Sequence, residues 1–241
     1  MLIIRLKKPL LHDADLDALR NTLLNERHYR YVVRQNACCY RPDGSLLFRF
    51  RKNALPAHLT DIPFRYLRNV GAPASNSLRG AVKASPSGTE ALIGINPRTG
   101  GVTAATLNLL PVLPEIMPYF WAKNARFSEL APEFYRRAAA AAHGRNTLAK
   151  GVVVESVKLL MNVQTGAHTD TNRSASLLTA IWKGRGEGAE LIFVRWGIAV
   201  DVRTGDLLIM DGAEMHGNAP YRGTPGEYER LSLTAFTAGH K

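Results

Sequence analysis

The sequence has few cysteines and no long hydrophobic run, and each absence excludes a class of protein. Two of its 241 residues are cysteines, Cys38 and Cys39, and they are neighbours. Adjacent cysteines rarely form a disulfide with each other, and lone thiols suit a reducing compartment. The absence of any CxxC pair excludes a cysteine-ligated zinc site. No stretch approaches about 18 consecutive apolar residues, so we expect neither a transmembrane helix nor a membrane partner.

Targeting signals, repeats and linkers are also missing. Residues 1–8 lack the apolar region and cleavage site of a signal peptide, so we expect a protein that is not secreted. The expected location is the cytoplasm, the nucleoid or, for a viral protein, the interior of a host cell. A content of 46% hydrophobic and 21% charged residues is typical of globular proteins. We expect one domain over 1–241, with a basic α+β part over 1–150 and a β core over 151–241, and favour a monomer.

The chain is basic, and the charge is uneven. The formal net charge is +11. Residues 1–100 hold 16 Lys and Arg against 7 Asp and Glu, or +9, whereas residues 101–241 hold 15 against 13, or +2. A basic half points to a polyanionic partner such as nucleic acid, although a basic protein without such a partner is the alternative.

Hydrophobic periodicity predicts a mixed N-terminal part and a β-rich C-terminal part. Helical spacing predicts a helix over 13–26 and another over 114–142 that breaks near Pro132, and residues 69–90 read as a long loop. The N-terminal part should also contain strands over 2–6, 31–33, 45–51, 91–95 and 102–107. Further strands are expected over 152–163, 177–182, 189–194, 198–202, 206–210 and 230–237. Short strands separated by glycine-rich turns suggest a sandwich or barrel.

An HxD pair and a later histidine are the first candidates for chemistry. His168 and Asp170 follow a predicted strand, and His216 lies 46 positions after Asp170, just past another strand. Two histidines and one carboxylate leave positions open on Fe(II), which suits a non-haem oxygenase. Zinc accepts the same ligands, so residue types alone do not fix the metal. A surface His–Asp pair without a metal is the alternative.

Arg230 is the candidate anion-binding residue. Period-two alternation places Arg230, Ser232 and Thr234 on one face of the last predicted strand. A guanidinium on the polar face of a strand within a β core needs a partner, and a bidentate carboxylate suits it. A solvated arginine on an exposed strand is the alternative. Arg222 is the competing arginine, but it lies in a loop flanked by glycine and proline.

Six sequence blocks resemble one known family. They are His168-Thr169-Asp170-Thr171-Asn172, Gly188-Ala189-Glu190-Leu191-Ile192-Phe193, Gly197-Ile198-Ala199-Val200-Asp201-Val202, Gly205-Asp206-Leu207-Leu208-Ile209, His216-Gly217-Asn218 and Arg230-Leu231-Ser232-Leu233. Their order and spacing over residues 155–237 resemble the TET/JBP branch of the 2-oxoglutarate and Fe(II)-dependent dioxygenases. The segments 40–44 and 46–52 also resemble microbial and viral members of this branch.

The resemblance implies a double-stranded β-helix, or jelly-roll, core within an α+β and mainly β fold. It implies that His168, Asp170 and His216 bind Fe(II), and that O2 is the oxidant. Arg230 would hold the distal carboxylate of the cosubstrate 2-oxoglutarate, with Ser232 beside it and Asn162 nearby.

The resemblance also implies a substrate, the 5-methyl group of a pyrimidine in DNA. The base would be single-stranded or flipped from the duplex, with 5-methylcytosine expected and thymine as the alternative. Asn172 and Arg173 stand where family members contact the base, although Arg173 departs from the acidic residue found there. Arg49, Arg51 and Lys52 are candidate phosphate contacts. A hydroxylase of a small molecule or free nucleotide, and a non-catalytic nucleic-acid-binding module, are the rival functions.

Overall fold

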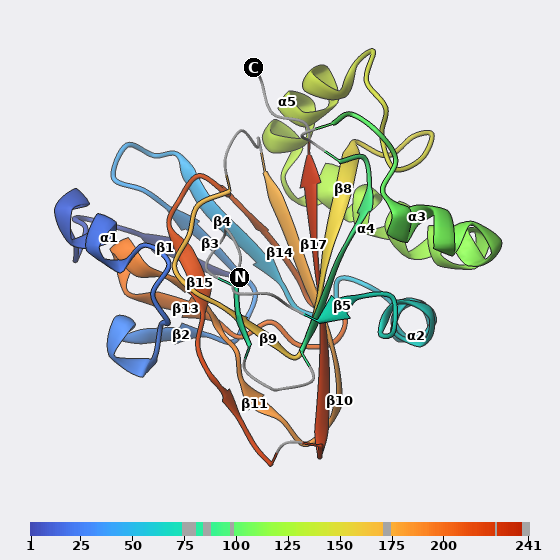
Figure 1. Ribbon diagram of the computed structural model, residues 1–241. Helices are drawn as coiled ribbons and strands as arrows, with labels where there is room; N and C mark the ends of the chain where they lie inside the picture. The colour runs from blue at the N-terminus through green and yellow to red at the C-terminus, as the bar shows by residue number, and fades with distance from the viewer. Residues whose placement is uncertain (74–80, 84–87, 97–98, 171–174, 225, 238–241) are drawn as a thin grey trace.

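Two β-sheets that face each other form the centre of the structure (Figure 1). The computed structural model describes residues 1–73, 81–83, 88–96, 99–170, 175–224 and 226–237. Along the large sheet the strands run β1 (Leu2–Arg5), β3 (Ala37–Tyr40), β4 (Leu46–Arg51), β14 (Leu207–Met210), β10 (Ser176–Gly184), β17 (Tyr228–Thr237), β8 (Val154–Met161), β7 (Thr89–Gly94) and β5 (Ala72–Pro73). The small sheet runs β15 (His216–Asn218), β12 (Leu191–Phe193), β13 (Ile198–Val200) and β2 (Tyr31–Val33). Two short pairs, β6 (Ala81–Lys83) with β9 (Val163–Thr165) and β11 (Glu187–Gly188) with β16 (Tyr221–Arg222), complete the sheets.

The space between the sheets is filled by aliphatic and aromatic side chains from both. Phe48 of β4 stacks on Phe193 of β12 with ring centroids 5.1 Å apart. Leu208 and Met210 of β14 belong to the same buried cluster as Val200 of β13. Burial of this apolar surface holds the two sheets together.

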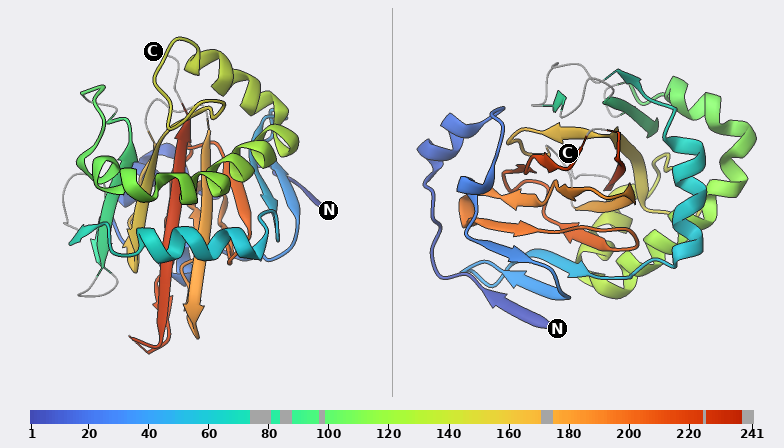
Figure 2. Two further views of the ribbon diagram at one scale, coloured as in Figure 1. Left: turned by 90° about the vertical axis from the view of Figure 1, so that its right-hand side faces the viewer. Right: turned by 90° about the horizontal axis from the view of Figure 1, so that it is seen from below.

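Helices cover the outer face of the large sheet (Figure 2). They are α2 (Ala57–Leu67), α3 (Ala104–Leu109), α4 (Leu113–Leu130) and α5 (Pro132–Ala142), whereas α1 (Asp13–Leu19) lies at the small sheet. Three short 3₁₀ turns span Glu26–His28, Leu110–Val112 and Val194–Trp196. No helix in the described part of the chain is both long and apolar enough to cross a membrane.

The alternation predicted for the last strand is confirmed. Leu231 and Leu233 of β17 pack in the cluster that joins the large sheet to the helices. Side chains alternate along a strand, so Arg230 and Ser232 face the other way, toward the small sheet. Both are buried.

The predicted α+β, mainly β architecture with a jelly-roll core is confirmed. The predicted helix break at Pro132 is also confirmed, because α4 ends at Leu130 and α5 starts at Pro132.

One predicted strand, over 102–107, is wrong. Residues 104–109 form α3, because Thr103 caps the helix by accepting a hydrogen bond from the backbone N–H of Thr106.

Other boundaries also differ. The helix predicted over 13–26 ends at Leu19, and Asn21 then takes a left-handed backbone conformation with φ 62°. The predicted loop over 69–90 contains β5 and β6, and residues 74–80 and 84–87 of it lie outside the described part. The patterns did not indicate α2, whose helical periodicity is interrupted by an internal proline, Pro63.

Candidate active site

His168, Asp170 and His216 come together as predicted. Their ligand atoms all lie within 4.8 Å of one another. The Nε2 atom of each histidine is 3.8 Å from a carboxylate oxygen of Asp170. His216 is the most deeply buried of the three and His168 the most exposed, with 3% and 20% of the side-chain surface accessible. The site therefore opens toward solvent on the His168 side.

Backbone pairing fixes the distance between the two histidines. The N–H of His168 donates to the carbonyl of His216, and the reverse bond is also made, both at 2.8 Å. Each Nδ1 lies 2.8 Å from a backbone carbonyl, that of Gly166 for His168 and that of Glu214 for His216. An Nδ1–H that donates to a carbonyl leaves Nε2 unprotonated, which is the state in which imidazole binds a metal.

Asp170 is held by two neighbours that the sequence did not indicate. Its backbone N–H donates to the Gly212 carbonyl at 2.7 Å, and the Ser176 hydroxyl donates to its Oδ2 at 2.6 Å. A Cβ at position 212 would lie 2.6 Å from the Ser176 Oγ and 2.9 Å from the Asp170 Cβ. Only glycine therefore fits without displacing the carboxylate. Such outer contacts orient a metal ligand.

Arg230 is a buried cation that lacks a carboxylate partner among the described residues. It is 1% exposed, and its Nε and Nη2 atoms have no hydrogen-bond partner in the described part of the chain. Nη1 lies 3.4 Å from the Tyr221 hydroxyl, and the guanidinium carbon stands 5.5 Å from the Trp182 ring centroid. A buried charge without a partner is costly. Two free donors on one guanidinium match the two oxygens of a carboxylate, so the residue fits the distal end of 2-oxoglutarate.

Arg222, the competing arginine, already has partners. It lies on β16 with 40% of its side chain exposed, and its Nη2 is 2.9 Å from the buried carboxylate of Glu190. Its Nη1 is 3.2 Å from Glu26. Arg222 therefore serves an ion-pair network, and Arg230 is the arginine left to bind a ligand.

The other two predicted cosubstrate residues flank Arg230 differently. Ser232 is 4% exposed and lies two positions further along the same face of β17. Asn162 binds the backbone of Arg230 on both sides: its Oδ1 accepts from the Arg230 N–H at 2.8 Å, and its own N–H donates to the Arg230 carbonyl at 3.0 Å. This contact positions Arg230 on the strand. Direct contact of Asn162 or Ser232 with the cosubstrate stays a prediction.

The residues predicted to bind DNA are not gathered at the metal site. Arg49 is half-buried on the helix-covered side of β4, Arg51 is exposed, and the Lys52 ammonium lies 3.7 Å from Asp206. Asn172 and Arg173, the predicted base contacts, lie outside the described residues. Their predicted roles stay predictions.

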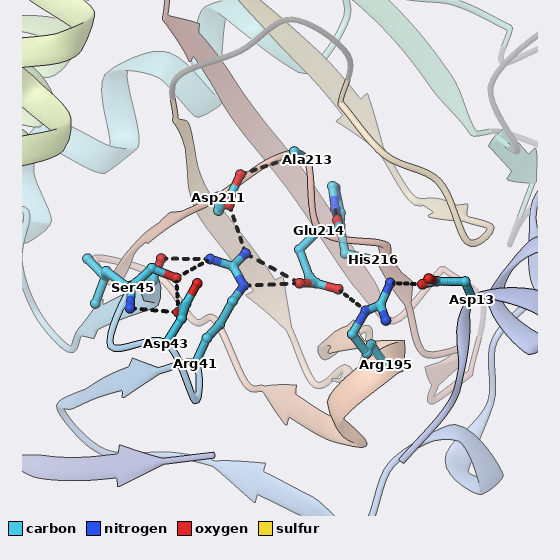
Figure 3. A network of polar contacts seen from close by, with 10 residues as sticks. Asp13, Arg41, Asp43, Ser45, Arg195, Asp211, Ala213, Glu214 and His216 are labelled. Atoms are coloured by element: carbon cyan, nitrogen blue, oxygen red, sulfur yellow. Dashed lines mark hydrogen bonds and ion pairs between the residues drawn. The ribbon is translucent and has the colours of Figure 1, made fainter. Parts of the chain in front are cut away.

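A polar network supports the segment that carries His216 (Figure 3). Arg41 donates from Nη2 to Asp211 at 2.7 Å and from Nε to Glu214 at 3.3 Å. Arg195 binds the other oxygen of Glu214 at 3.2 Å and also pairs with Asp13. Glu214 is 8% exposed, so these bonds fix the loop between Gly212 and His216. Sequence spacing gave no signal for this network, because its members come from four distant segments.

Comparison with solved structures finds a similar fold. The structure "NgTET1 in complex with 5mC DNA" matches with a TM-score of 0.66 and 16% identity, covering 87% of this chain and 79% of that chain. An oxidoreductase of the 2OG-Fe(II) oxygenase family from Burkholderia pseudomallei matches at TM-score 0.49 and 12% identity, over 100% and 96% of the two chains. OsALKBH1 matches at TM-score 0.47 and 15% identity, over 79% and 97%. No protein-family model and no curated protein sequence matches.

The fold and the chemistry of the site point in the same direction. The fold is that of NgTET1, and the interior of the two sheets carries a His-Asp-His triad with the ligand types that Fe(II) oxygenases use. The two unpartnered donors of Arg230 supply the complementary anion site. The triad offers a donor set for Fe(II), and Arg230 offers donors for a carboxylate such as the distal one of 2-oxoglutarate.

Proposed function

We propose that the enzyme oxidises the 5-methyl group of a pyrimidine in DNA, with 5-methylcytosine as the base. The observation that carries the proposal is the similarity of the fold, over 87% of the chain, to a structure of NgTET1 with 5mC DNA. The net charge of +11, concentrated in residues 1–100, supports a polyanionic substrate.

Three groups of residues would have separate roles in this reaction. His168, Asp170 and His216 would hold Fe(II), and Arg230 would hold 2-oxoglutarate by its distal carboxylate. The iron and 2-oxoglutarate, when bound with O2, supply the oxidant for an unactivated C–H bond. The chain's own part is to orient the methyl group and exclude water, and the apolar packing around Phe48 and Phe193 keeps one side of the interior dry.

A methyl group inside a duplex is out of reach of a buried metal. The base must therefore be flipped out or be offered in a single strand. The opening of the site on the His168 side is the route by which such a base would enter, because His216 is closed off from solvent.

The test is mass analysis of nucleosides after incubation with methylated DNA. The protein would be supplied with Fe(II), 2-oxoglutarate and O2, and given single-stranded and duplex DNA containing 5-methylcytosine, and unmethylated DNA containing thymine. We expect 5-hydroxymethylcytosine, with stoichiometric succinate, and neither product with His168→Ala. Succinate formed without any oxidised base in either DNA would remove DNA as the substrate and favour a small-molecule hydroxylase. The absence of iron-dependent succinate under all conditions would favour a non-catalytic binding module.

A further inference from the structure

A hollow on the outer side of the large sheet gathers four arginines, three of which take no part in the network that supports His216. It has a volume of about 840 Å³ and lies between the turn joining β3 to β4 and the first residues of α5. Arg41, Arg49, Arg136 and Arg137 line it, together with Tyr40. In this subsection we refer to these four arginines and their surroundings as the arginine hollow.

Three of the four arginines carry charge that no neighbour neutralises. Arg41 is committed to Asp211 and Glu214, as described above. Arg49, Arg136 and Arg137 make no ion pair within the described part of the chain, and the Nε of Arg49 is shielded from solvent without a hydrogen-bond partner. A shielded donor without an acceptor is the feature that a bound anion would complete.

The charge balance and the helix start both favour an anion. Of the two carboxylates that line the hollow, Asp211 is paired with Arg41, which leaves Glu133 against three arginines. Residues 131–134, the N-terminal turn of the 11-residue helix α5, form one wall. The free N–H groups and dipole of a helix N-terminus add to the attraction of the guanidinium groups. The arginine fork matches the geometry of phosphate oxygens, as it does that of a carboxylate.

The hollow adjoins the metal site. Asp211 lines it, and the carbonyl of the next residue, Gly212, accepts the hydrogen bond from the backbone N–H of Asp170. On β4, Arg51 lies two residues beyond Arg49 on the same side, about 7 Å further along the strand. The row of guanidinium groups thus extends beyond the hollow. A strand with successive phosphates would use such a row, whereas a single small anion would not need it.

We propose that the arginine hollow binds a phosphodiester group of the nucleic-acid strand whose base enters the active site. The proposal rests on the function proposed above, and it assigns the backbone contact to Arg49, Arg136 and Arg137. Phosphate contacts of this kind position the strand and carry no information on base sequence.

Binding measured against salt tests the hollow without relying on turnover. The probe is a fluorescein-labelled single-stranded oligonucleotide containing 5-methylcytosine, followed by anisotropy from low to moderate salt. The variant is R136Q/R137Q, in which both residues are exposed and their loss should not unfold the protein. The matched control is R27Q/R65Q, which removes two exposed arginines elsewhere. Each phosphate that is no longer neutralised lowers the log–log salt slope by about 0.7, so R136Q/R137Q, which removes two of the three arginines around one phosphodiester group, should lower it by roughly 0.7. Its affinity at low salt should fall about tenfold or more.

Two further measurements are needed. One distinguishes a nucleic-acid strand from a free phosphate or mononucleotide as the ligand, and the other separates this proposal from the proposed function. Deoxycytidine monophosphate and inorganic phosphate, used as competitors, should displace the oligonucleotide only weakly. An unchanged salt slope in R136Q/R137Q, or an equal fall in the control, would overturn the proposal, and so would a site that binds the mononucleotide as tightly as the strand. Oxidation of methylated DNA is scored separately. If R136Q/R137Q lowers the salt slope but no oxidised base is found, the phosphate-binding proposal stands and the proposed reaction is rejected. If methylated DNA is oxidised but the slope is unchanged, the proposed reaction stands and the phosphate-binding proposal is rejected.

Discussion

Replacing Arg230 with methionine should have opposite effects on stability and on cosubstrate binding. Two of its nitrogen atoms, Nε and Nη2, are buried and have no hydrogen-bond partner among the described residues. Burying a polar group without a partner costs about 1–3 kcal/mol, so the methionine variant should be more stable when no ligand is present. In a chain of this size each kcal/mol moves the melting temperature by about 2–4 °C. We therefore expect a melting temperature several degrees above that of the wild type.

Cosubstrate binding should weaken in the same variant. A charge-assisted hydrogen bond is worth about 1.5–3 kcal/mol, and a carboxylate loses at least one such bond. A loss of about 2–3 kcal/mol corresponds to a Kd for 2-oxoglutarate that is roughly 30- to 140-fold higher. Isothermal titration with 2-oxoglutarate under anaerobic conditions, with Fe(II) present, measures this value without needing the DNA substrate.

Arg222→Ala is the control for this experiment. It leaves the buried carboxylate of Glu190 without its partner, so it should destabilise the fold while changing the affinity for 2-oxoglutarate little. If Arg222→Ala abolished 2-oxoglutarate binding and Arg230→Met did not, the assignment of Arg230 would be refuted. A lower melting temperature for ligand-free Arg230→Met would contradict the interpretation of its unbonded atoms.

Four further variants test other parts of the structure. Because metal affinity depends on the number of ligands, His168→Ala and Asp170→Ala should each abolish Fe(II) binding and turnover. The circular dichroism spectrum should stay unchanged. Wild-type turnover in either variant would reject the triad. Gly212→Ala should cut Fe(II) affinity by about 10- to 100-fold through displacement of Asp170, with little change in melting temperature; unchanged affinity would show that the close contact relaxes freely. Burial lowers the pKa of Lys123 well below its usual 10.5, so the unfolded chain binds this proton more readily. The free energy of unfolding should therefore gain a contribution from Lys123 as pH rises toward about 10.5. Lys123→Met should remove this pH-dependent gain, measured by urea titration at several pH values. The same variant should be more stable than the wild type at neutral pH. A wild-type pH dependence in Lys123→Met would exclude Lys123 as its source.

The metal ligands could be predicted because their signal is local. His168 and Asp170 are two residues apart after a strand, and His216 follows another strand, so spacing made them candidates and the family resemblance added the expected metal. Arg230 could be predicted for a similar reason, because alternation along β17 separates polar from apolar residues.

Residues that act through distant partners could not be predicted in this way. Gly212 matters because Asp170 and Ser176 approach its Cα, and nothing in its own neighbourhood shows this. Asn162 carries a polar side chain near the predicted site, but its amide oxygen is used by the Arg230 backbone. The strand predicted over 102–107 failed since a single side chain, the Thr103 hydroxyl, caps a helix there.

The N-terminal strands complete both sheets around the C-terminal core. β4 pairs with β14, β2 pairs with β13 and β7 pairs with β8, so each supplies the hydrogen-bonding neighbour of a core strand. A fragment starting at residue 151 would turn β14, β13 and β8 into edge strands with unpaired backbone groups. Such edges recruit other chains, and we expect the fragment to aggregate. The metal ligands all lie within it, yet their scaffold depends on segments made earlier in translation, and the site can form only after these long-range pairings close.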